Sequence, residues 1–220
     1  MRSARQVHNV DFSPSVIIAE RRRDEERVGE DGEGECMRWD CVDLLDGEDL
    51  LRVCGRSAYD LVVDKSTSDA ISCAEDVVVS IPSSITKGRK EDVFARGSGG
   101  ESKEILFHPL HVMAINLAIV TKPGARWIAL SYTVERYPFL EDDAAPVEGD
   151  GTGKDGIPDP GLLWTIISKH QIEAEQEDGS SSAVTHRPKV YHWVYVLQRT
   201  SELLHNDISI PTNTSQHLRF

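Results

Sequence analysis

The sequence predicts an α/β domain built on a mostly parallel sheet, with one antiparallel strand near an edge of that sheet. The first observation is the stretch YDLVVDKSTSD, Tyr59–Asp69, in which an apolar run ends abruptly in Asp64 and Lys65. A strand with a charged tip and a capped helix behind it is typical of the carboxyl end of a buried parallel strand. Taken alone, the stretch is better explained as an ordinary turn, because Asp, Ser and Thr are common helix caps.

The order of the predicted elements is the second observation. Val7–Val10 is a short strand that ends at Asp11, and Ser13 and Pro14 then provide the cap and the first residue of a helix. Met37–Val42 is a second short strand that leads into another acid. Strands that alternate with helices in this way are typical of a parallel sheet covered by helices.

The end of the chain is the third observation. Ile105–Thr121 is the clearest helix, because apolar residues recur there at helical spacing, and Arg126–Tyr132 follows as a strand. Two further strands, Leu162–Ile172 and Lys189–Gln198, are joined by a polar loop. The last of them carries apolar residues on both faces, which indicates a strand inside the sheet. This closing pair predicts the antiparallel strand.

The composition excludes several classes of function. The net charge is −13 and the isoelectric point is near 5.0, whereas nucleic-acid binding needs a basic face. The four cysteines have no CxxC spacing, so we expect free thiols and no metal site. The longest apolar run is too short to cross a bilayer, and the chain starts without a signal peptide, so we expect a cytoplasmic protein with no membrane contact.

The distribution of polar residues predicts one domain over 1–200 and a tail over 201–220. Polar insertions interrupt this domain near 80–103, 141–160 and 173–187. The sequence GTGKDG in the second insertion is not a phosphate-binding loop, because Lys154 is followed by Asp155 and not by Ser or Thr. The oligomeric state has no signature in the sequence.

Several pieces of the sequence resemble class I S-adenosylmethionine-dependent methyltransferases, in particular the elongation-factor-1A lysine methyltransferases and their fungal relatives. The pieces are VDFSPSVI (Val10–Ile17), MRWDCVDLLD (Met37–Asp46), YDLVVDKSTSDAI (Tyr59–Ile71), KPGARWIALSYT (Lys122–Thr133) and PKVYHWVYVLQR (Pro188–Arg199). The third piece is the most specific of them. The resemblance implies a Rossmann-like class I methyltransferase sheet, S-adenosyl-L-methionine as the methyl donor, and a protein lysine as the acceptor.

The resemblance also implies which residues bind the nucleoside half of the methyl donor. Asp11 corresponds to the acid that binds the two ribose hydroxyls, and Phe12 lies beside the adenosine. Asp43 corresponds to the residue that accepts a hydrogen bond from the adenine amino group, and Leu44 flanks the ring.

The remaining implied residues surround the methyl group. Asp64 and Lys65 correspond to the methionine end of the cofactor, with Asp64 as the candidate catalytic residue that positions the reacting groups. Tyr132 and Thr133 correspond to the lining of the channel for the target lysine.

One departure from the family is large. Its first motif, a strand followed by an acid-x-Gly-x-Gly loop, has no counterpart in the ten residues before Asp11, whereas a βαβ unit needs ~30 residues. The expected fold is therefore truncated at its amino end, without the first strand and the glycine loop. The alternative function is a catalytically inactive remnant or a binding protein. A nucleotide-dependent oxidoreductase is disfavoured, because no GxGxxG is present.

Overall fold

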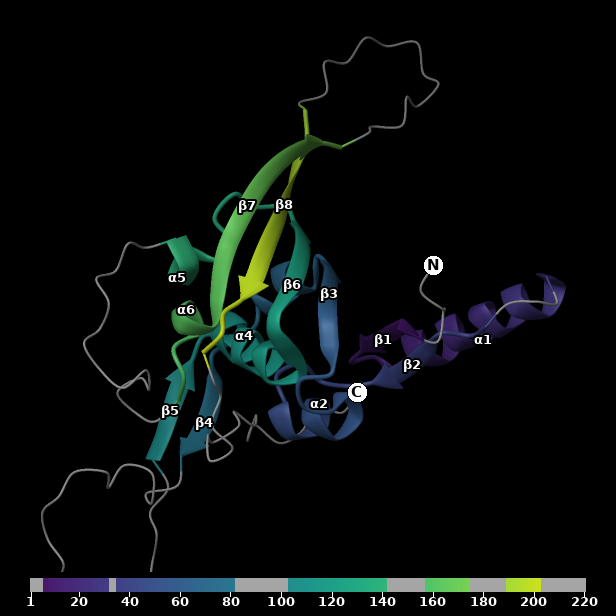
Figure 1. Cartoon of the computed structure of the whole chain (residues 1–220), viewed down its shortest axis with the longest axis horizontal. Coiled ribbons are helices and arrows are strands. Elements are labelled where there is room, and N and C mark those ends of the chain that lie inside the picture. Colours follow the sequence, from purple (N-terminus) through teal and green to yellow (C-terminus); the bar gives the residue numbers. More distant parts are fainter. Residues whose placement is uncertain (1–5, 32–34, 82–102, 142–156, 175–188, 203–220) are drawn as a thin grey trace, which may run out of the picture.

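The computed structural model describes residues 6–31, 35–81, 103–141, 157–174 and 189–202 (Figure 1). Most of the three predicted polar insertions, and the tail after residue 202, lie outside these ranges. Among the described residues, no helix is both long enough and apolar enough to cross a membrane.

The first unit is a pair of parallel strands with one helix. Strands β1 (His8–Asp11) and β2 (Arg38–Cys41) pair in register from their first to their last residues. Helix α1 (Pro14–Asp31) joins them and buries Ile17 and Asp24. The Asp24 carboxylate accepts a hydrogen bond from the backbone N–H of Met37 at 2.6 Å, which ties the helix to the start of β2.

The largest sheet has four strands in the order β3-β6-β8-β7. Its strands are β3 (Tyr59–Lys65), β6 (Thr121–Ser131), β8 (Tyr191–Arg199) and β7 (Trp164–Glu173). The β3–β6 pair is parallel, and the β6–β8 and β8–β7 pairs are antiparallel. In Figure 1, β7 and β8 extend well beyond the ends of their neighbours.

The remaining elements surround this sheet. Two helices follow the parallel strands, namely α2 (Gly47–Cys54) and α3 (Thr67–Ile71). Strands β4 (Val77–Ile81) and β5 (Lys103–Phe107) form a separate antiparallel pair. Helix α4 (Pro109–Val120) is buried along almost its whole length. Two short helices, α5 (Pro138–Glu141) and α6 (Pro160–Leu163), precede β7.

The prediction of a Rossmann-like class I methyltransferase sheet, mostly parallel with one antiparallel strand near the edge, is wrong. The strands of the described residues form three sheets: a parallel pair, a mixed sheet of four and an antiparallel pair. Among the described residues, the two parallel pairs do not pair with each other as strands, and β8 pairs antiparallel on both of its sides. The interior position predicted for β8 is confirmed, because it lies between β6 and β7.

The start of the long predicted helix is also corrected. Residues Ile105 and Leu106 belong to β5, where they pair with Val79 and Val78, and the helix starts only at Pro109. Proline is favoured in the first turn of a helix, and the His108 Nδ1 atom accepts a hydrogen bond from the N–H of Leu110 at 3.2 Å. Leu106 is consequently 65% exposed.

We expect Met113→Ala, in the middle of α4, to destabilise the chain strongly. The Met113 side chain is 1% exposed, and its truncation leaves a cavity, for which the cost is about 2–5 kcal/mol. Urea unfolding followed by circular dichroism measures the change. Leu106→Ala is the matched control and should shift the unfolding free energy by no more than about 0.5 kcal/mol. Equal losses in the two variants would contradict the assignment of the core.

Candidate functional site

The predicted nucleoside-binding residues lie where two parallel strands end. Asp11 is the last residue of β1 and pairs with Cys41, the last residue of β2. The N–H of Val42 donates to the carbonyl of Asp11 at 2.9 Å, and Asp43 follows at once. Since the carboxyl ends of adjacent parallel strands meet at one edge, the structure brings Asp11 and Asp43 to the same edge.

The Asp11 side chain is half-buried, and that of Phe12 is exposed to solvent. Oδ1 of Asp11 accepts a hydrogen bond from the N–H of Ser13 at 2.8 Å, which forms the turn into α1. Among the described residues, no hydrogen bond reaches Oδ2. Phe12 is 78% exposed, which is unusual for a large aromatic side chain. The edge therefore offers one unoccupied carboxylate oxygen and one exposed ring.

Asp43 and Leu44 stand on the turn between β2 and α2. Oδ1 of Asp43 accepts from the N–H of Leu45 at 2.9 Å. The surrounding chain desolvates the Asp43 carboxylate and raises its pKa above the ordinary value, and Asp46 and Asp49 act in the same direction. The carbonyl of Leu44 accepts from Nδ2 of the buried Asn116 at 2.9 Å, so the position of this turn is determined by α4.

Asp64 lies inside the protein, at the end of β3, and is 5% exposed. Its carboxylate accepts hydrogen bonds from the N–H groups of Thr67 and Ser68 at 2.7 and 3.2 Å, and from the Ser68 hydroxyl. Burial raises the pKa of Asp64. The Ser68 hydroxyl also lies 2.7 Å from the Tyr137 hydroxyl. The carboxylate thus holds the first turn of α3, while the neighbouring Lys65 is exposed.

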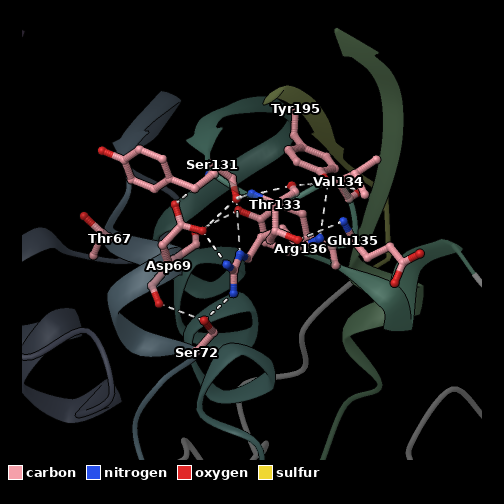
Figure 2. Close-up of polar contacts among 12 residues, drawn as sticks. Thr67, Asp69, Ser72, Ser131, Thr133, Val134, Glu135, Arg136 and Tyr195 are labelled. Atoms are coloured by element: carbon pink, nitrogen blue, oxygen red, sulfur yellow. Dashed lines mark hydrogen bonds and ion pairs between the residues drawn. The ribbon is translucent and has the colours of Figure 1, made fainter. Parts of the chain in front are cut away.

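The predicted substrate-binding residues sit on a segment that a polar network holds in place (Figure 2). Asp69 accepts hydrogen bonds from the Ser131 hydroxyl at 2.7 Å and from the N–H of Tyr132 at 3.2 Å. It also forms an ion pair with Arg136, and both side chains are 13–14% exposed. The guanidinium of Arg136 reaches the hydroxyls of Ser131 and Ser72 in addition.

Tyr195 of β8 completes this network. Its hydroxyl donates to the backbone carbonyls of Thr133, at 3.0 Å, and Val134, and it accepts from the N–H of Arg136 at 3.2 Å. Tyr132 is 63% exposed on the segment held in this way. Sequence reasoning missed Arg136, because the residue belongs to no local pattern and its partner lies 67 positions earlier. The sequence feature that could have indicated this ion pair was Asp69, the second acid of the DKSTSD stretch.

A cleft of about 270 Å³ separates β1 from β3. Of the predicted site residues, Asp11 and Leu44 line it. Polar residues at its wall include Asn9, Tyr59, Cys54 and His8. Nε2 of His8 lies 3.0 Å from the Asp40 carboxylate, and its Nδ1 bonds to the Tyr59 hydroxyl. Burial lowers the pKa of His8 and raises that of Cys54, so both groups are neutral near pH 7. Across the described ranges, no group of three or more metal-ligating side chains is gathered.

Comparisons with known proteins leave the family open. No protein-family model matches the sequence, and no curated protein matches it. One solved structure, described as "Conversion of a Disulfide Bond into a Thioacetal Group during Echinomycin Biosynthesis", is similar with a TM-score of 0.43 and 17% identity. The match covers 87% of this chain and 65% of the other, so the chain spans less than two thirds of that length. A likeness at this level assigns neither a fold nor an activity.

We expect Asp64→Asn to change how stability depends on pH. Burial raises the pKa of Asp64 in the folded chain, so the folded state binds a proton more readily than the unfolded state, in which the pKa is ~3.9. The stability that Asp64 contributes is therefore fully present below ~3.9 and is lost as pH rises through the folded pKa. The free energy of unfolding, measured with urea at a series of pH values, should decline less steeply with rising pH in the variant than in wild type.

The matched control for this experiment is Asp60→Asn on the same strand. The Asp60 side chain is 54% exposed, so its substitution should leave the pH profile of wild type unchanged. If Asp64→Asn followed the wild-type profile as well, the buried carboxylate would not be the source of the pH dependence.

We expect the ion pair between Asp69 and Arg136 to couple strongly in a double-mutant cycle. Asp69→Asn and Arg136→Met each leave a largely buried charge without its partner, for which the cost is about 3 kcal/mol. The double variant should lose less than the sum of the two, by about 0.5–3 kcal/mol. The exposed pair Lys122 and Asp60 is the control and should couple by no more than about 1 kcal/mol. Additive losses at Asp69 and Arg136 would show that the network does not act as a unit.

Proposed function

We propose that this chain is an S-adenosylmethionine-dependent methyltransferase that acts on a lysine of a protein substrate. The observation that carries the proposal is the pair of carboxylates, Asp11 and Asp43, at one edge of a parallel strand pair. An acid at the tip of such a strand binds the hydroxyls of a ribose, because its two oxygens accept from two neighbouring O–H groups. A second acid beside it suits the amino group of an adenine.

The described residues fit the nucleoside half of the methyl donor. Oδ1 of Asp11 accepts from the N–H of Ser13, which orients the carboxylate, and Oδ2 together with the second lone pair of Oδ1 stays available for the two ribose hydroxyls. Phe12 offers an exposed aromatic ring against which a nucleoside packs. Asp43 is oriented by the N–H of Leu45, and Leu44 provides an apolar surface anchored to α4. Each group is thus oriented by its own turn and needs no further ordering.

The residues assigned to the methyl group divide into two roles. S-adenosyl-L-methionine supplies an activated methyl group, and the acceptor must be a neutral amine aligned with it. Lys65 is exposed and carries a positive charge suited to the methionine carboxylate. Asp64 acts from inside the protein, because its carboxylate holds the turn that follows Lys65. Tyr132 and Thr133 lie on the segment fixed by Asp69 and receive the substrate side chain.

The charge of the chain supports a basic protein as the acceptor. With a net charge of −13, the surface attracts lysine-rich partners and repels phosphate-rich ones. The ion pair of Asp69 with Arg136 holds the Tyr132 segment rigid, which favours the alignment that methyl transfer needs.

A second candidate is a protein that binds a partner without catalysis. One observation favours it: the buried carboxylate of Asp64 is engaged by Thr67 and Ser68, so it holds the turn of α3 and is not free to contact a transferred methyl group. Binding of the cofactor decides between the two candidates.

We expect purified chain to bind S-adenosylmethionine in isothermal titration calorimetry, and Asp11→Ala and Asp43→Ala each to weaken the affinity about tenfold. Each substitution removes hydrogen bonds to the nucleoside, and a loss of about 1.4 kcal/mol corresponds to a factor of ten. Glu25→Ala, which removes an exposed carboxylate on α1, is the matched control and should bind as wild type does.

The outcome that separates the two candidates is simple. Saturable binding, followed by methyl incorporation into recombinant elongation factor 1A detected by mass spectrometry, supports the methyltransferase. Absence of binding, in a sample that circular dichroism shows to be folded, rejects it in favour of the binding protein.

A further inference from the structure

Ser72 follows the last residue of helix α3 and contacts the polar network that holds residues 132–136 (Figure 2). Its hydroxyl donates to the backbone carbonyl of Asp69 at 2.7 Å and accepts a hydrogen bond from Nη1 of Arg136. Nη2 of the same guanidinium forms the ion pair with the Asp69 carboxylate. One arginine therefore contacts a serine hydroxyl and a carboxylate side by side.

The charge of Arg136 is balanced inside the protein. The Arg136 and Asp69 side chains are 14% and 13% exposed, so solvent screens their attraction only in part. Nε of Arg136 donates to the Ser131 hydroxyl at 3.3 Å, which is a neutral partner. The position of the guanidinium thus depends on the Asp69 carboxylate, and a stronger anion placed on Ser72 competes with that carboxylate directly.

The residues that follow Ser72 are the second observation. Residues 73–76 are all exposed, and two of them, Glu75 and Asp76, stand three and four positions after Ser72. Acids at these positions suit a kinase that holds its substrate through a basic groove. Helix α3 has only five residues, and so short a helix opens readily at its end. A kinase can therefore bind the two acids and reach the Ser72 hydroxyl.

Ser66 stands before the same helix and provides a contrast. It also has an acid three positions later, Asp69, but Arg136 and the Ser131 hydroxyl already bind that carboxylate. A carboxylate that the fold uses in this way is not available to a kinase, whereas Glu75 and Asp76 are exposed. Two serines with similar sequence surroundings are thus distinguished by the structure.

We propose that Ser72 is a phosphorylation site, and that a phosphate there draws Arg136 away from Asp69 and loosens residues 132–136. In the kinase, Oγ of Ser72 attacks the γ-phosphorus of ATP, and the bond from that phosphorus to the oxygen it shares with the β-phosphate breaks. The hydroxyl proton passes to a base of the kinase, and ADP leaves. The product is a phosphate monoester on Ser72.

The direction of the effect follows from charge. A serine phosphate carries about −1.5 to −2 charges at pH 7 and binds an arginine through two oxygens. Two anions then share a single guanidinium, so the Asp69 carboxylate is left largely buried with its counter-charge withdrawn. The phosphate also stands at the carboxyl end of α3, where a negative charge is unfavourable. Both effects weaken the hydrogen bond that Asp69 accepts from the N–H of Tyr132.

The first measurement is phosphoryl transfer from radiolabelled ATP to the purified full chain by an acidophilic kinase of the casein-kinase class. We expect labelled phosphate on Ser72, located by mass spectrometry, and no label there in Ser72→Ala. Glu75→Gln combined with Asp76→Asn should be labelled at least about tenfold more slowly, because two exposed carboxylates are lost. Ser66→Gly is the matched control and should be labelled as wild type is, since glycine adopts the positive φ of that position.

The second measurement uses chain in which phosphoserine is incorporated at position 72 during synthesis. Amide hydrogen exchange at Tyr132 and Arg136, whose N–H groups donate to Asp69 and Tyr195, should be at least about tenfold faster than in wild type. Exchange in the buried helix α4 should stay constant. Ser72→Ala is the control for the lost hydroxyl and should accelerate exchange much less, because it leaves the ion pair in place.

Three results would overturn the inference. They are the absence of label on Ser72, equal exchange at Tyr132 and Arg136 with and without the phosphate, and faster exchange in α4 as well, which would mean that the phosphate unfolds the chain as a whole. Neither measurement involves methyl transfer, so the inference fails or holds separately from the proposed function. Only a consequence for a substrate lysine beside Tyr132 rests on that function.

Discussion

Helix α4 is hydrophobic on every side, and the rest of the described chain is arranged so that this helix is buried. Every residue from Val112 to Val120 is at most 4% exposed. A helix of this kind is stable only when packed on all faces, so it requires the sheet on one side and α2, α3 and α6 on others. In Figure 1, α4 lies against the four-stranded sheet at the centre of the molecule.

The polar groups around α4 show how closely the packing is specified. The indole N–H of Trp164 donates to the carbonyl of Ala114 at 2.8 Å, and Nε of the buried Arg199 donates to that of Ala118 at 3.3 Å. Asn116 reaches outward to the carbonyl of Leu44. Each of these bonds joins α4 to a different segment, so the turn that carries Asp43 and the end of β8 both take their positions from the same helix.

The candidate site depends on this core in two different ways. At β3, Asp64 is tied through Ser68 to Tyr137, whose ring packs edge-on against Trp127 of β6 at 5.1 Å between centroids. The strand end is therefore part of the core, and its carboxylate is buried. At β1 the acid stands on a small unit of two strands and one helix, joined to the core by side chains across a cleft. An aspartate at the end of a strand is thus part of the packed core in the case of Asp64, whereas Asp11 remains accessible to solvent.

The sequence by itself determined the local structure. An apolar run that ends in Asp64 and Lys65 located β3, and apolar residues on both faces of Lys189–Gln198 identified β8 as an interior strand. The cap signals at Ser13 and Pro14 located the start of α1 correctly. These features depend on residues that are neighbours in the chain, so their physical causes are visible in a short window. The helix boundary at Pro109 was placed several residues too early, because Ile105 and Leu106 fit a helical period until their pairing with β4 is known.

Tertiary structure alone decided which strands pair, and hence the division into three sheets. The pairing of β8 with both β6 and β7, and the separation of the β1–β2 pair from β3 in the described part of the chain, depend on contacts between residues far apart in the sequence, which no periodicity encodes. The same holds for the ion pair of Asp69 with Arg136 and for the burial of Asp64. A carboxylate at a strand tip looks the same in sequence whether it faces solvent or the core, because its environment is supplied by segments that arrive only when the chain folds.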